Sequence, residues 1–268
     1  MLQYLDRVLS GWENLAAKAT VRGEVAHPGS YGIQPGEHLS SVLLRAGGYT
    51  PEAFPYGAVL MRSEVREAEE KSHQDLIRRV QAQQANIKLL PDAGQEERNA
   101  KLTAIAQTQA TLDQLRLAPP VGRVVIHIDG PIQKWKNTAS DVELRDGDIL
   151  LIPKKTGYVL VTGQVFNSTA VSYRGGRSAN WYLGQAGGTT QLADKKGIFV
   201  IRADGSVISA KNHSSFWSGN PLNATLRPGD TVVVPEKALN IGNKNWTALL
   251  QAAQIASSIA LTVSAFHL

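Results

Sequence analysis

Cysteine is absent from this chain of 268 residues, which excludes a disulfide framework, a thiolate metal site and a cysteine nucleophile. The run of basic residues that is typical of a nucleic-acid-binding arm is also missing, because the net charge of +5 is spread along the sequence. Nucleic acid is therefore not expected as a partner. Ordinary solubilising charge is the simpler interpretation of the basic balance, and an anionic polymer as partner is the alternative.

Motifs of catalysis and metal binding are missing as well. The six histidines show neither HxH nor HxxxH spacing, and there is no GxSxG motif and no duplicated acidic residue that resembles a glycosidase pair. The segment Asp146-Gly147-Asp148 lacks the further oxygen ligands of a calcium loop and predicts a turn. His127 and Asp129 share the face of a predicted strand. They could form a dyad, but the favoured interpretation is a surface pair. We expect no catalytic residue, metal or cofactor.

An internal repeat organises what is present. Residues 21–62 align without a gap with residues 161–202 at an offset of 140, and 12 of the 42 positions are identical. A second pair of segments, LRDGDILLIP at 144–153 and LRPGDTVVVP at 226–235, is related by an offset of 82. Because the offset falls from 140 to 82, the first copy contains 58 additional residues. The chain therefore holds two copies of one module, and the first copy is interrupted.

Each copy predicts a small α+β unit in which a strand hairpin is followed by a short helix and further strands. VRGEV at 21–25 alternates apolar and polar residues as a half-buried strand does, and Ser40–Ala46 has a capping serine and an apolar face. The glycines after this helix are expected to end it in the left-handed conformation. A β-grasp fits this order best. The glycines that define the module are Gly23, Gly47, Gly48, Gly163, Gly187 and Gly188.

The additional residues lie mainly between Ser63 and Ala118. Apolar residues recur there at helical spacing on both sides of the break Pro91-Asp92-Ala93-Gly94. This pattern predicts an antiparallel helical hairpin with a thin apolar seam, closer to a coiled-coil arm than to a self-sufficient domain. The seam residues assigned to the second helix are Leu102, Ile105, Leu112 and Leu115.

These segments resemble the soluble-ligand-binding β-grasp (SLBB) module. Its pattern V-x-G-x-V-x-x-P-G, then L-x-x-x-L-x-x-A-G-G and a strand ending in Arg is matched by VRGEVAHPG, LSSVLLRAGG and GAVLMR. Two such modules, a hairpin inside the first and an amphipathic C-terminal stretch resemble the outer-membrane polysaccharide export (OPX) family. The predicted organisation is the first module at 21–153 with its insertion at about 63–118, the second module at 154–237, and a C-terminal amphipathic transmembrane helix at 238–268.

Two features of that family have no counterpart in this sequence. Its members usually begin with a lipoprotein signal that ends in a cysteine, followed by an export-sequence domain with a GPGD-like motif, and neither is found here. Residues 1–20 resemble the end of that domain, and we interpret them as its remnant.

The C-terminal stretch 245–268 contains no Asp, Glu, Lys or Arg. As a helix it would be about 36 Å long, enough to cross a bilayer core of about 30 Å. Polar residues recur every three or four positions and are predicted to line a wet lumen: Thr247, Gln251, Gln254, Ser258 and Thr262. The residues predicted to face lipid or the interface are Trp246, Leu250, Ile255, Ile259 and Phe266. We expect several copies to form an α-helical barrel, and a membrane-surface or packed helix is the alternative.

The resemblance implies a homo-oligomeric ring, an octamer by analogy with the family, in the outer membrane with its SLBB modules in the periplasm. Capsular polysaccharide or exopolysaccharide would pass through the ring without chemistry, supplied by the inner-membrane synthesis and export machinery. The alternative is a periplasmic carbohydrate- or cofactor-binding protein built of the same modules. Candidate sugar-stacking aromatic residues, for which core and interface packing is the simpler interpretation, are Trp181, Tyr182, Phe216 and Trp217.

Overall fold

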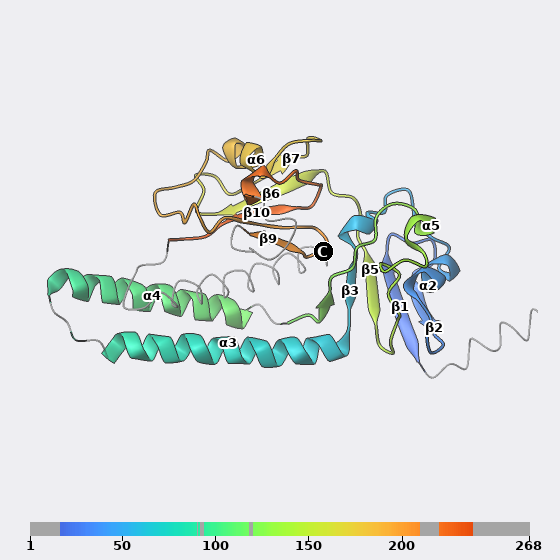
Figure 1. Cartoon of the computed structure of the whole chain (residues 1–268), viewed down its shortest axis with the longest axis horizontal. Coiled ribbons are helices and arrows are strands. Elements are labelled where there is room, and N and C mark those ends of the chain that lie inside the picture. The colour runs from blue at the N-terminus through green and yellow to red at the C-terminus, as the bar shows by residue number, and fades with distance from the viewer. Residues whose placement is uncertain (1–16, 90, 92–93, 118–119, 210–219, 238–268) are drawn as a thin grey trace, which may run out of the picture. The chain divides into compact units, whose positions relative to one another are not determined.

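The computed structural model describes residues 17–89, 91, 94–117, 120–209 and 220–237 (Figure 1). The predicted pore-lining and lipid-facing residues from Trp246 to Phe266 lie outside these residues, as do Phe216 and Trp217. The chain divides into two compact units. The first contains the described residues up to Glu67 together with Gly122–Gly157 and Arg202–Ser206, and the second contains the remainder.

A mixed sheet of five strands forms the centre of the first unit, in the order β2-β1-β5-β3-β4. Its central strand is parallel to β1 and antiparallel to β3. The strands are β1 (Lys18–Gly23), β2 (Gly29–Gly32), β3 (Val59–Met61), β4 (Arg123–Val124) and β5 (Ile149–Ile152). The helices are α2 (Leu39–Arg45), the 3-10 helix η1 (Pro55–Gly57) and α5 (Ile132–Trp135). The apolar face of α2 packs in one core with the sheet, through Leu39, Val42, Leu43, Val21, Leu60 and Leu150.

The second unit repeats this sheet, with the order β7-β6-β10-β8-β9. The elements are β6 (Tyr158–Gly163), β7 (Thr169–Ser172), α6 (Ala179–Gln185), β8 (Phe199–Ile201), β9 (Val207–Ser209), the 3-10 helix η2 (Pro221–Asn223) and β10 (Thr231–Val234). Val161 pairs with Val232, the pair that the two sequence offsets place over Val21 and Leu150 of the first sheet. The prediction of a mixed α+β fold with two such sheets is confirmed.

Two long helices, α3 (Ser63–Leu89) and α4 (Gln95–Leu117), follow β3 (Figure 1). They pack in antiparallel fashion, because Val80 clusters with Leu112 and Leu115 while Gln84, nearer the end of α3, contacts Ile105. Leu102 is 60% exposed, so its assignment to the seam was wrong. Thr108 and Thr111 of α4 are buried although they are polar, because their hydroxyl groups donate to the carbonyl oxygens four residues earlier, at 2.6 Å and 2.9 Å.

The N-terminus of α2 differs from the prediction of a capping serine. The N-cap residue is His38, and the amide and hydroxyl of Ser40 donate to the carboxylate of Asp141 at 2.9 Å and 2.8 Å. Asp141 is buried, and it also accepts the amide of Asn137 at 2.9 Å. The helix is therefore held at its start by a residue 101 positions later, which no local sequence pattern predicts.

Candidate functional site

In both modules the first strand ends at a glycine. Gly23 has φ +81° and Gly163 has φ +94°, and a Cβ atom at either position would lie 2.1 Å from a carbonyl oxygen of the neighbouring parallel strand. The same carbonyl accepts the next amide of the chain, from Glu24 in one module and Gln164 in the other, both at 2.8 Å. Only glycine combines this conformation with this approach. The other module-defining glycines, Gly47, Gly48, Gly187 and Gly188, also have positive φ.

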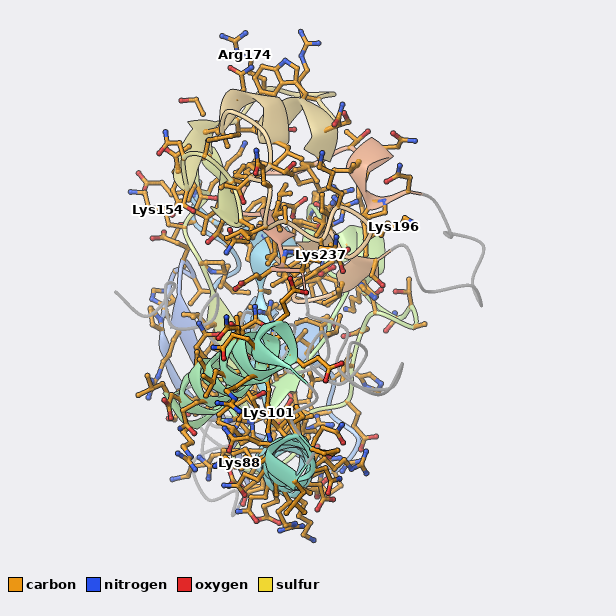
Figure 2. All side chains as sticks on the ribbon, turned by 90° about the vertical axis from the view of Figure 1, so that its left-hand side faces the viewer. Lys88, Lys101, Lys154, Arg174, Lys196 and Lys237 are labelled. Carbon is orange, nitrogen blue, oxygen red and sulfur yellow. The ribbon has the colours of Figure 1, made fainter. Side chains whose placement is uncertain are left out.

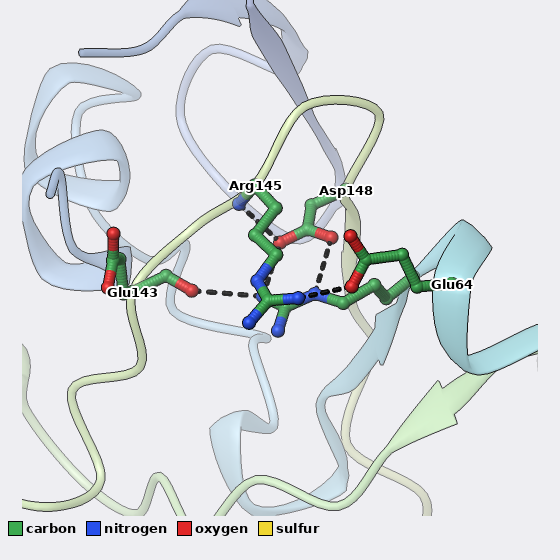
Figure 3. A network of polar contacts seen from close by, with 5 residues as sticks. Glu64, Glu143, Arg145 and Asp148 are labelled. Atoms are coloured by element: carbon green, nitrogen blue, oxygen red, sulfur yellow. Dashed lines mark hydrogen bonds and ion pairs between the residues drawn. The ribbon is translucent and has the colours of Figure 1, made fainter. Parts of the chain in front are cut away.

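An ion-pair network joins the strands of the first module (Figure 3). The guanidinium of Arg62 donates to both carboxylate oxygens of Asp148, from Nε at 3.0 Å and from Nη2 at 2.7 Å, and Nη2 also donates to the carbonyl of Glu143 at 2.9 Å. The side chain of Asp148 is 0% exposed. The hydrogen bond to Asp148 raises the pKa of Arg62 above its ordinary value. Asp148 therefore serves a structural ion pair, and Arg145 contacts Glu64 at the rim of the network.

Arg123 of β4 holds the turn Arg202–Ser206 that joins β8 to β9. Its Nη2 donates to the carbonyl of Ala203 at 2.7 Å, and a Cβ atom on Gly205 would lie 2.5 Å from its Nε. Burial lowers the pKa of Arg123 to about 10, against the attraction of Asp204, so the group stays charged near neutral pH. His127 Nδ1 lies 3.3 Å from Asp204 Oδ2. The sequence pattern indicated Asp129 as the partner of His127, and it did not predict this contact with Asp204.

Arginine and tryptophan side chains gather at the start of α6 in the second module. The Cζ atoms of Arg174 and Arg177 lie 5.7 Å and 5.5 Å from the centroid of the Trp181 ring. Both arginines are exposed, Trp181 is half-buried, and Figure 2 shows the side chain of Arg174 pointing away from the ribbon of its unit. Tyr182 is fully buried, so this candidate sugar-stacking ring is a core residue. We call Arg174, Arg177 and Trp181 the Arg–Trp cluster.

The equivalent surface of the first module has a different charge. The offset of 140 places Arg174 over Gln34, Arg177 over Glu37 and Trp181 over Ser41. Residues 158–193 contain two arginines and no other Asp, Glu, Lys or Arg, whereas the equivalent residues 18–53 contain three basic and three acidic residues. Our sequence prediction named Trp181 but missed the two arginines, and the signal that finds them is this change of charge between aligned copies.

In the parts of the chain that the structure describes, no three His, Asp or Glu side chains are grouped so as to hold a metal ion. None of the helices in these parts is both long and apolar enough to cross a bilayer. The candidate binding feature of the described surface is the Arg–Trp cluster.

Comparison with known proteins identifies the domain class of the first module. Residues 18–66 match the SLBB domain family, in agreement with the motifs of the first module. Two curated relatives from Escherichia coli, both called polysialic acid transport protein KpsD, are 27% identical over 248 residues. The match covers 88% of this chain and 39% of the length of each relative, so the chain spans well under half of the proteins that it resembles. These matches confirm the resemblance to the outer-membrane polysaccharide export family with SLBB domains.

Proposed function

We propose that this chain is a non-catalytic subunit of an oligomeric channel that exports capsular polysaccharide or exopolysaccharide through the periplasm and outer membrane. The observation that supports this most is the match to the polysialic acid transport proteins, which runs through 88% of the chain and so includes both modules and the inserted hairpin. The repeated sheet supports it further, because two copies of one module are suitable building blocks for a ring.

In this proposal the modules form the periplasmic body of a homo-oligomeric ring, and residues 238–268 cross the outer membrane as an α-helical barrel. Thr247, Gln251, Gln254, Ser258 and Thr262 would face the lumen, and Trp246, Leu250, Ile255, Ile259 and Phe266 would face lipid or the interface. Inner-membrane synthesis and export machinery would deliver the polymer to the ring. Octameric symmetry is the starting assumption, taken from the family.

The mass of the assembly extracted from outer membranes in mild detergent tests the proposal. A ring of several copies, together with loss of surface polysaccharide when the gene is deleted from its host, is the expected result. A monomer that fractionates with the soluble periplasmic proteins contradicts it and favours the alternative, a periplasmic carbohydrate-binding protein built of SLBB modules.

The orientation of the C-terminal helix is tested separately. Ile255→Asp should abolish membrane assembly and Ser258→Asp should not, because a carboxylate is costly against lipid and tolerated in a wet lumen.

A further inference from the structure

Tyr182 fixes the loop that carries the Arg–Trp cluster. Its ring is fully buried, and its hydroxyl donates to the carbonyl of Arg174 at 3.0 Å and accepts the amide of Arg174 at 2.8 Å. Val42 occupies this position in the first module, and its side chain has no polar atom for such bonds. The second module therefore holds the backbone of Arg174 through both of its polar groups, so the side chain starts from a defined position.

Trp181 then restricts the two guanidinium groups. Both lie within 6 Å of its ring centroid, a distance at which the cation is attracted to the ring, and the ring itself packs edge-on against Tyr182 with centroids 4.9 Å apart. No carboxylate among the described residues forms an ion pair with Arg174 or Arg177. In the first module, by contrast, Arg45 is neutralised by Glu37 at 2.7 Å. The second module thus presents two positioned and unneutralised positive charges.

The chemistry of these side chains defines the ligand. A guanidinium presents parallel N–H donors that match the two oxygens of a carboxylate, and positioning the donors in advance reduces the entropy lost on binding. An indole ring beside them provides an apolar surface for the C–H groups of a sugar ring. We propose that the Arg–Trp cluster is a binding site for carboxylate-bearing saccharide units, with Arg174 and Arg177 binding the carboxylate and Trp181 contacting the sugar. The saccharide part of this proposal rests on the proposed export function, and the anion part rests on the cluster itself.

Direct binding to the purified full chain tests the site. Isothermal titration calorimetry would use oligogalacturonate as the acidic probe, the same oligomer after reduction of its carboxyl groups as the neutral probe, and a thymidine oligonucleotide and a phosphodiester-linked saccharide as other anions. The variant is Arg174→Gln with Arg177→Gln. The matched control is Lys195→Gln with Lys196→Gln, which removes the same charge from two exposed residues of the same module.

We expect the acidic oligomer to bind and the neutral one not to bind. The arginine variant should weaken binding at least about tenfold, and the lysine control less than about twofold. Tyr182→Phe should weaken binding in the wild-type chain but have no further effect in an Arg174→Gln background, because Tyr182 acts through Arg174. Absence of binding, equal loss in the arginine variant and the lysine control, or equal or tighter binding of the oligonucleotide or the phosphodiester-linked saccharide would overturn the proposal.

The outcome is independent of the test of the export function. If the chain forms the ring and the arginine variant still binds acidic oligomers normally, this site is refuted while the channel proposal stands. If the chain is a monomer that binds them through Arg174 and Arg177, the site stands and the channel proposal is refuted.

Discussion

The two modules have the same strand order and register but different helix faces. Where backbone meets backbone the copies are identical in residue type, as at Gly23 and Gly163. Where side chains meet solvent they differ, so that exposed Gln34 of the first module is replaced by exposed Arg174 in the second. The comparison separates two kinds of constraint. The fold requires a particular residue only where a Cβ atom would collide with the backbone or a charge could not be accommodated. The remaining surface can differ between the copies, so one copy can carry a function that the other lacks.

The largest expected effect tests whether the two copies share their backbone constraint. Gly23→Ala and Gly163→Ala each place a Cβ atom 2.1 Å from a carbonyl oxygen at positive φ, so each should destabilise its own unit by about 4 kcal/mol. Chemical denaturation measures the loss, and hydrogen exchange shows which sheet loses protection.

The chain provides a matched control for these substitutions. Gly36 and Gly176 also align in the repeat and have φ +79° and +74°, but no atom lies within 4 Å of a Cβ built on either. Gly36→Ala and Gly176→Ala should therefore cost only about 1 kcal/mol, the backbone part of the penalty. If all four variants lose the same stability, the close approach to the carbonyl is not what requires glycine.

The next effect concerns the ion pair that joins the strands of the first module. Arg62→Met should destabilise the first unit by about 3 kcal/mol, because it leaves the carboxylate of Asp148 buried without its partner. Equilibrium unfolding in urea measures this. Arg145→Met is the control within the same network and should change stability by less than about 0.5 kcal/mol, because the Arg145 side chain is 57% exposed. Equal losses in the two variants would show that the burial of Asp148 is not decisive.

Features of the fold that recur in both copies could be predicted from the sequence, whereas two side-chain contacts that occur only once could not. Aligned copies predicted the glycines of the modules and the DGD turn, because a backbone constraint recurs wherever the backbone recurs. The bond from Ser40 to Asp141 was missed, because its partners are 101 residues apart and Asn223 stands at the aligned position of the second copy. Burial of Thr108 was missed because polarity is a poor guide where a hydroxyl group bonds to its own helix.

A third prediction concerns a contact within the first unit, between Arg123 and the turn at Gly205. Gly205→Ala should cost about 3 kcal/mol, since φ is +88° and the new Cβ atom would lie 2.5 Å from Nε of Arg123. In an Arg123→Ala background the same substitution should cost only about 1 kcal/mol, because the obstructing side chain is gone. A double-mutant cycle of unfolding free energies measures the coupling, expected at about 2 kcal/mol. A coupling near zero contradicts the contact.

The smallest effect compares a hydrogen bond that both modules make with different chemistry. The hydroxyl of Thr50 donates to the carboxylate of Glu24 at 2.5 Å, and the hydroxyl of Thr190 donates to the amide oxygen of Gln164 at 3.0 Å. A charged acceptor makes the stronger bond, so Thr50→Val should cost about 1.5 kcal/mol and Thr190→Val about 1 kcal/mol. Glu24→Gln should make the first module resemble the second and reduce the cost of Thr50→Val to that of Thr190→Val. Denaturation of the single variants and of the Glu24→Gln, Thr50→Val double variant decides this. An unchanged cost of Thr50→Val in the Glu24→Gln background would show that the charge at this position does not strengthen the bond.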